Sequence, residues 1–184
     1  MSINNIYIQS IEKQYVDLKN SLNMITEKLS EDQFNTKPAP DKWSVAECIG
    51  HLNATWDQYK GLINNAVTQN QNSSVKNSDI FNPRYLMKLF TNMMEPPYKF
   101  KMKTFTKFVP LEKFNKQETL NKFNSDVDEF IDYIKIAENV DLKNTIVISP
   151  VSKVIKFQLG ELFPFLAAHA RRHIWQADNV IKIV

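Results

Sequence analysis

The chain has 184 residues with three glycines and one cysteine, and its 23 lysines and arginines exceed its 20 acidic residues by three. This length fits one domain that buries most of its apolar surface, so we expect a single domain over residues 1–184. The small, dispersed charge surplus excludes the basic face of a nucleic-acid-binding or membrane-surface protein, and a lone cysteine excludes an internal disulfide.

No stretch of the chain approaches the roughly 18 apolar residues of a membrane span. The N-terminal segment carries Glu12, Lys13 and Asp17 among its apolar positions, so it lacks the uninterrupted core of a signal peptide. We therefore expect a cytoplasmic protein.

The first predicted helix covers residues 11–29. Apolar residues recur there at spacings of three and four and form one continuous stripe: Ile11, Tyr15, Leu18, Leu22, Ile25 and Leu29. The following residues, 30–43, include Pro38 and Pro40 and predict an extended connection.

The second predicted helix begins at the sequence SVAE. The Ser44 hydroxyl there can accept from the amide of Glu47 while the Glu47 carboxylate reaches back, which is a capping box. A broad apolar face runs on to Val67, and His51 lies at the edge of that face. Polar residues occupy the other side: Asn53, Asp57, Lys60 and Asn64.

The middle of the chain is less regular. Residues 68–79 are polar and predict a mobile loop, the sequence NPRYLMKLFTNMME predicts a short helix that Pro96 and Pro97 stop, and residues 98–116 predict an extended crossover. Apolar side chains gather in this region and either pack over the end of the bundle or line a pocket or dimer contact: Phe81, Tyr85, Met87, Phe90, Met93, Met94, Tyr98 and Met102.

Two more helices are predicted in the last third of the chain. The first covers residues 120–134, and the sequence NTIVISPVSKVIKFQ after it predicts a short β-like segment limited by Pro150. The last helix runs from about Gln158 to Ile181. Its apolar side holds Leu162, Leu166, His169, His173 and Val180, and its opposite side holds Glu161, Arg171, Asp178 and Lys182. Four long helices predict an all-α four-helix bundle with irregular crossover segments.

The three histidines of the chain all face the predicted interior. His169 and His173, in the sequence HARRH, are one helical turn apart, with Cβ atoms about 5–6 Å from each other. Buried imidazoles need partners for both nitrogens and repel one another when protonated. A divalent cation shared with His51 would resolve both problems and leave a coordination position open, as in catalytic sites. Imidazole ligands suit Zn, Ni, Cu or Fe; the alternative is a coincidental spacing of core histidines.

Five residues near the histidines each have two interpretations. Cys48 is either a fourth ligand or nucleophile, or a small buried hydrophobe. Glu47 acts as an acid or base, or only caps its helix. Gln58 and Gln176 either orient a ligand or are ordinary surface residues. Arg172 either pairs with a substrate carboxylate or is a solvated or ion-paired surface residue.

Two stretches of the chain, PAPDKWSVAECIGHL and HARRHIWQADNV, resemble the paired signature of the DinB-like (DinB/YfiT) superfamily. The resemblance implies an up-down-down-up four-helix bundle, often a homodimer, with a nickel- or zinc-type divalent metal ion held by His51, His169 and His173. Some relatives are S-transferases or isomerases that use a low-molecular-weight thiol such as bacillithiol, mycothiol or glutathione.

The leading functional hypothesis is therefore a metal-dependent, thiol-dependent S-transferase, or a related detoxification enzyme, acting on a small-molecule electrophile. Two alternatives stay open. A metal-dependent hydrolase would turn over without added thiol, and a non-catalytic metal- or ligand-binding stress protein would hold its metal in a closed coordination shell. The catalytic residues are not assigned by the sequence.

Overall fold

The computed structural model of the chain describes residues 3–70, 81–97 and 114–184. The elements in this part of the chain are α1 (Ile3–Thr26), α2 (Glu31–Asn35), α3 (Val45–Gln69), α4 (Tyr85–Met94), α5 (Lys116–Ile136), the 3₁₀ turn η2 (Ala137–Asn139), β1 (Ile146–Ile148), β2 (Lys156–Gln158) and α6 (Leu159–Ile181). The all-α prediction is confirmed, because each of the two strands has only three residues. Most of the loop predicted for residues 68–79 and of the crossover predicted for residues 98–116 lies outside the described residues. At their described ends both predictions were wrong, because α3 continues to Gln69 and α5 begins at Lys116.

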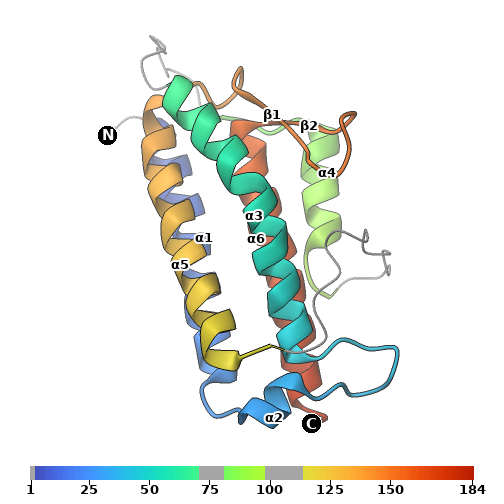
Figure 1. The fold of residues 1–184 in the computed structure, drawn as a ribbon. Helices are drawn as coiled ribbons and strands as arrows, with labels where there is room; N and C mark the ends of the chain where they lie inside the picture. The colour runs from blue at the N-terminus through green and yellow to red at the C-terminus, as the bar shows by residue number, and fades with distance from the viewer. Residues whose placement is uncertain (1–2, 71–80, 98–113) are drawn as a thin grey trace.

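The four long helices form a bundle in which α1 and α6 run in one direction and α3 and α5 in the other (Figure 1). Both α1 and α3 pack against α5 and α6. This is the up-down-down-up order that the resemblance implied. Because α3 and α6 are antiparallel neighbours, the first half of α3 lies beside the second half of α6, and this contact positions the site described below. In the described part of the chain, no helix combines the length and the apolarity needed to cross a membrane.

The predicted apolar stripe of α1 faces the centre of the bundle. Its members from Ile11 to Leu22 are buried, and the last two, Ile25 and Leu29, pack against the core from its edge. The hydroxyl of Tyr15 donates to the carbonyl oxygen of Phe163 at 3.0 Å and so ties α1 to α6. Burial of these large side chains is the main stabilising contribution to such a bundle, at about 25 cal/mol per Å² of apolar surface.

The segment before α3 contains a short helix that the sequence interpretation missed. Ser30 caps α2 and accepts from the amide of Gln33 at 3.1 Å, while the Gln33 side chain accepts from the amide of Ser30. The helix buries Phe34 against the core. Pro38 and Pro40 lie beyond α2, where residues 38–42 form a turn in which the amide of Lys42 donates to the carbonyl oxygen of Ala39 at 3.0 Å. The prediction of an extended connection was therefore wrong for residues 31–35 and 38–42.

The segment between α5 and α6 forms a small antiparallel hairpin, in which Ile146 pairs with Gln158 and Ile148 with Lys156. The predicted β-like segment is therefore present, and Pro150 lies in the loop beyond β1.

At the other end of the molecule, the capping box predicted for Ser44 and Glu47 is confirmed. The amide of Glu47 donates to the Ser44 hydroxyl at 3.1 Å, and the amide of Ser44 donates to the Glu47 carboxylate at 2.8 Å.

Glu161 lies in the interior, although the periodicity of its helix placed it on the polar side. Its carboxylate accepts from the backbone amides of Arg84 at 2.8 Å and Gln158 at 3.0 Å, and it pairs with the Arg84 guanidinium at 2.6 Å. The chain just before α4 covers the first turn of α6, and the periodicity of α6 alone carries no information about that cover.

Two glycines of α3 differ in the space around them, which gives a test of packing near the site. A Cβ added at Gly50 would lie 2.3 Å from Cζ of Phe114, whereas nothing lies within 4 Å of a Cβ at Gly61. We expect Gly61→Ala to raise the free energy of unfolding by about 0.5–1 kcal/mol, the difference in helix propensity. Gly50→Ala should instead lower it by about 1–2 kcal/mol, because overpacking outweighs that gain. Chemical denaturation of both variants measures the contrast, and equal changes would contradict the packing beside His51.

Candidate metal centre

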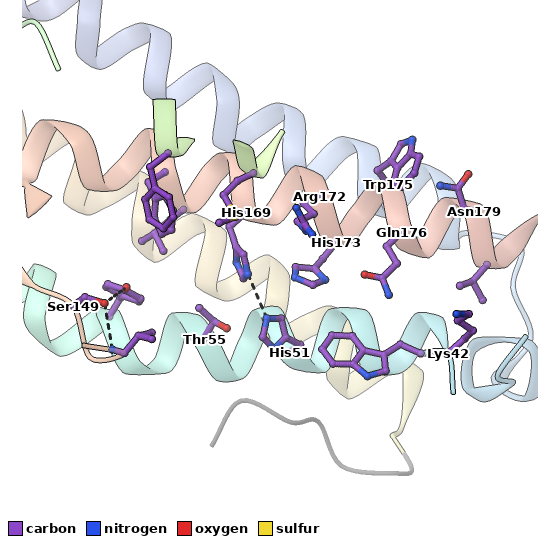
Figure 2. Close-up of a pocket in the computed structure, with 18 of the residues that line it drawn as sticks. Lys42, His51, Thr55, Ser149, His169, Arg172, His173, Trp175, Gln176 and Asn179 are labelled. Atoms are coloured by element: carbon purple, nitrogen blue, oxygen red, sulfur yellow. Dashed lines mark hydrogen bonds between the residues drawn. The ribbon is translucent and has the colours of Figure 1, made fainter. Parts of the chain in front are cut away.

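The three histidines meet between α3 and α6 (Figure 2). His51 comes from the second turn of α3, and His169 and His173 come from successive turns of α6. The Nε2 atoms of His51 and His169 lie 3.3 Å apart, and one nitrogen from each of the three rings lies within 4.8 Å of the others. The chain thus brings together the three residues that the sequence singled out.

The indole of Trp43 closes one side of this histidine cluster. Its ring centroid lies 5.1 Å from that of His51 and 5.8 Å from that of His173. Trp43 directly precedes Ser44, the residue that caps α3, so the cap that fixes the start of the helix also fixes the indole. The sequence interpretation gave Trp43 no role, although Trp43 lies in PAPDKWSVAECIGHL, one of the two stretches that carry the family resemblance.

The environment of the cluster keeps the imidazoles of His169 and His173 neutral. Burial lowers the pKa of His169 to about 3, and the neighbouring His51 and Arg172 act in the same direction. Burial, followed by His169, His51 and Arg172, also lowers the pKa of His173 well below its ordinary value, and a hydrogen bond with Gln176 opposes this only in part. Near pH 7 both rings therefore have the uncharged form that a metal ligand needs.

The geometry of the cluster fits a shared cation. Two nitrogens that each lie about 2.0–2.1 Å from a tetrahedral ion are about 3.3–3.4 Å from each other, and the Nε2 atoms of His51 and His169 are 3.3 Å apart. A hydrogen bond between two imidazoles would explain this distance alone. The buried Nδ1 atoms of His169 and His173 have no hydrogen-bond partner in the described chain, although buried polar atoms are normally paired. A shared cation would give a partner to Nδ1 of His173, whereas an ion held by Nε2 of His169 would leave Nδ1 of that ring unpaired.

A cavity of about 1240 Å³ adjoins the histidines. Its walls come from α3, α4, α6, the hairpin loop and the connection before α3, and most of its lining side chains are apolar. The three histidines form part of its wall. His169 is half-buried and lines the cavity, so a small molecule in the cavity can reach the cluster.

Two of the other candidate residues do not belong to the site. Cys48 is fully buried, its pKa is raised by burial and by Glu47, and it is not part of the histidine cluster. Its interpretation as a small buried hydrophobe therefore holds. Glu47 caps α3 and pairs with Lys37 at 2.8 Å, so the cap explains it. Gln58 is exposed on α3 and serves below as a control.

Two polar residues of α6 do lie at the cavity. Gln176 lines it and is hydrogen-bonded to His173. Arg172 is buried, lines the same cavity and lies 3.5 Å from the carbonyl oxygen of Met93. Both were open alternatives in the sequence, and the structure places neither at the outer surface.

The apolar cluster of the middle segment divides between two roles. Phe90 stacks on Phe165 of α6 at 5.0 Å and, with Met94, lines the cavity. Tyr85 and Met93 are exposed. Packing over the bundle and lining a pocket were alternatives in the sequence, and α4 does both; Tyr98 and Met102 lie outside the described residues.

Three hydroxyl groups of the cavity wall escaped the sequence interpretation. Tyr59 and Ser149 form a pair, with their oxygens 3.0 Å apart, and Thr55 lies one helical turn after His51 (Figure 2). Tyr59 and Thr55 follow His51 at spacings of four, which placed them on its helix face, but no pattern indicated that this face borders a cavity. Ser149 reaches the site only through the hairpin.

Comparison with known proteins gives one match. A family model described as the DinB superfamily matches residues 14–177 of the chain, which include all four long helices in large part and all three histidines. No curated protein and no solved structure matches the chain.

Proposed function

The chain belongs to the DinB superfamily, and from this premise we propose that it binds a divalent metal ion, nickel or zinc, at His51, His169 and His173 and catalyses a thiol-dependent S-transfer to a small electrophile. The observation that carries the proposal is the convergence of three imidazoles at the wall of a large, mostly apolar cavity. Such a donor set leaves at least one coordination position for a reacting group.

The residues of the chain hold and shield this centre. His51, His169 and His173 would bind the ion as neutral ligands, and an ion bound there would lower the pKa of a thiol and stabilise its thiolate. Trp43 packs against two of the rings and keeps water away from that side. Gln176, hydrogen-bonded to His173, fixes the orientation of its ring, as partners of ligand histidines commonly do.

The composition of the cavity wall favours thiol transfer over hydrolysis. Zinc hydrolases commonly place a carboxylate beside the metal as a general base. Among the described residues that line the cavity, Asp41 is the one acidic side chain, and it does not belong to the histidine cluster. A thiol needs no such base, because its pKa falls within reach of neutral pH once a metal or another cation is near.

An assay with the metal-loaded protein tests the proposal. We expect protein loaded with zinc or nickel to couple bacillithiol, mycothiol or glutathione to an electrophile such as 1-chloro-2,4-dinitrobenzene, and a chelator to abolish this activity. Mass spectrometry of the product measures the transfer. Bound metal with no thiol consumption in any pairing would contradict the transferase, and ester turnover without thiol would assign the site to hydrolysis. The homodimer and the cytoplasmic location stay predictions.

A further inference from the structure

The cavity has different polar groups on the two sides of the histidines. Lys42, Gln176 and Asn179 lie with Trp175 toward one end, and the hydroxyl residues Thr55 and Ser149 lie toward the other (Figure 2). The end with Thr55 and Ser149, which we call the apolar arm, also holds Val151 and Ile155, whose backbones bond to Ser149. Phe165, which precedes His169 on α6, contacts Phe90 and Phe157 there. The ring of Phe165 lies 5.0 Å from Phe90 and 4.9 Å from Phe157, so these rings form a continuous apolar wall.

One polar atom in the apolar arm has no partner. The Oγ1 atom of Thr55 is buried and makes no hydrogen bond in the described structure, and the side chain as a whole is 7% exposed. Other helical threonines of this chain bond back to the carbonyl oxygen four residues earlier: Thr26 to Leu22, Thr68 to Asn64 and Thr119 to Asn115, at 2.6–2.8 Å. Thr55 does not, and Figure 2 shows its hydroxyl turned toward His51.

An unsatisfied hydroxyl in an apolar wall destabilises the free protein, and at the wall of a cavity a bound molecule can supply the missing partner. The nearby hydroxyls of Tyr59 and Ser149 are hydrogen-bonded to each other at 3.0 Å, and the Ser149 oxygen also accepts from the amide of Val151. Thr55 is the hydroxyl of this arm that has no hydrogen-bond partner in the described structure, so it can donate to a bound molecule without breaking another bond. One donor in an otherwise apolar arm selects a molecule that is mostly hydrocarbon and carries one acceptor close to the histidines.

We propose that the apolar arm binds an uncharged, largely hydrocarbon electrophile, an α,β-unsaturated ketone in class, with its carbonyl oxygen accepting from the hydroxyl of Thr55. This inference rests on the proposed thiol transfer for its chemistry, but not for the binding itself. The polar end with Lys42, Gln176 and Asn179 is left for the thiol substrate, which is the more polar partner.

The addition balances without another reactant. The thiol ionises and its sulfur forms a bond to the β-carbon of the ketone, and the electron pair of the carbon–carbon double bond moves toward the carbonyl oxygen. The Thr55 hydroxyl donates to that oxygen as negative charge develops on it, which stabilises the charge more than the neutral ketone. The α-carbon then takes a proton from water, which replaces the proton that the thiol released.

A pair of nearly isosteric probes separates the hydrogen bond from apolar burial. Acetophenone carries a carbonyl where ethylbenzene carries a methylene, and neither probe reacts with thiols, so both can be titrated into zinc-loaded and chelator-treated protein by ¹H–¹⁵N NMR. We expect Thr55→Val to weaken acetophenone about fivefold, the effect of one hydrogen bond, and to leave ethylbenzene within about twofold. Ile155→Lys should weaken both by about tenfold or more, because it brings a charge to the apolar arm.

The matched control is Asn179→Ala at the polar end, which should change neither affinity. Thr55→Val should also melt no lower than the unchanged protein, since it removes a buried hydroxyl without a partner. The inference would be overturned if Thr55→Val weakened the binding of both probes equally. It would also be overturned if the probes changed the NMR chemical shifts only of residues near Asn179. Loss of thiol transfer with these affinities intact would instead contradict only the proposed function.

Discussion

Replacement of His173 by alanine is expected to lower the affinity of the chain for zinc at least about 100-fold. Loss of a residue that only supports a metal ligand costs about 10–100-fold, so loss of a ligand should cost no less. The chain has three histidines, and all three belong to the cluster, so no other imidazole of the chain can replace the missing one. Competition with a chromophoric chelator, on protein without a histidine tag, measures the affinity.

A second variant and a control keep this prediction decisive. His173 is buried, so its replacement leaves a void beside the cavity, whereas His169 is partly accessible and His169→Gln keeps more of the local packing. Both should lose zinc while their circular dichroism stays helical. Gln58→Ala, on the exposed side of α3, should bind zinc unchanged. Zinc binding to His169→Gln with unchanged affinity would refute the three-histidine site.

Glu161→Ala is expected to lower the free energy of unfolding by about 3 kcal/mol. The carboxylate is 2% exposed and accepts from two backbone amides and the Arg84 guanidinium. Removing one partner of a buried ion pair costs about 3–5 kcal/mol, and the lower end applies because the Arg84 side chain is 47% exposed and can return to water. Urea denaturation measures the change.

The effect of Glu161→Ala also depends on pH. Burial alone would raise the pKa of Glu161, but the hydrogen bonds from Arg84 and from the Gln158 amide outweigh it and hold the pKa below its ordinary value of 4.5. The unfolded chain therefore takes up a proton at this position before the folded chain does, so the stabilisation is complete above about pH 4.5 and is lost as pH falls through the lower, folded-state pKa. The difference in stability between the two proteins should shrink over that range.

The matched control for Glu161→Ala is Asp178→Ala on the same helix. Asp178 pairs with Lys182 at 2.5 Å on the surface of α6, and such pairs contribute about 0.3–0.5 kcal/mol. Its replacement should change stability by no more than that and show no comparable pH dependence. Similar losses for the two variants would contradict the burial of Glu161.

Periodicity predicted the bundle because each long helix has one continuous apolar stripe, and a stripe of this kind has to be buried against other helices. The start of α3 was also readable, since the capping box of Ser44 and Glu47 is a local pattern. The same kind of pattern, Ser30 followed by Gln33, marks the start of α2. This helix was missed because Pro38 and Pro40 predicted an extended chain. Both prolines lie beyond the last residue of α2 and do not prevent it.

The three histidines of the site could be predicted from the sequence, but the helix contact and the cavity around them could not. The helical turn between His169 and His173 is a local property, and the periodicity of its own helix placed His51 on an inward face, in agreement with the family signature. The contact between α3 and α6 that unites them depends on how four helices pack, which no single stripe specifies. The exposure of Thr55 to a cavity, like the cover over Glu161, arises from segments that pack against these helices from elsewhere in the chain.

The order of the helices along the chain has a consequence for synthesis. The two halves of the histidine cluster are 118 residues apart, and the later half lies in the last helix of the bundle. A growing polypeptide emerges from the ribosome N-terminus first, so it carries His51 long before its partners exist. A cation held by all three histidines would therefore be captured only after translation of α6.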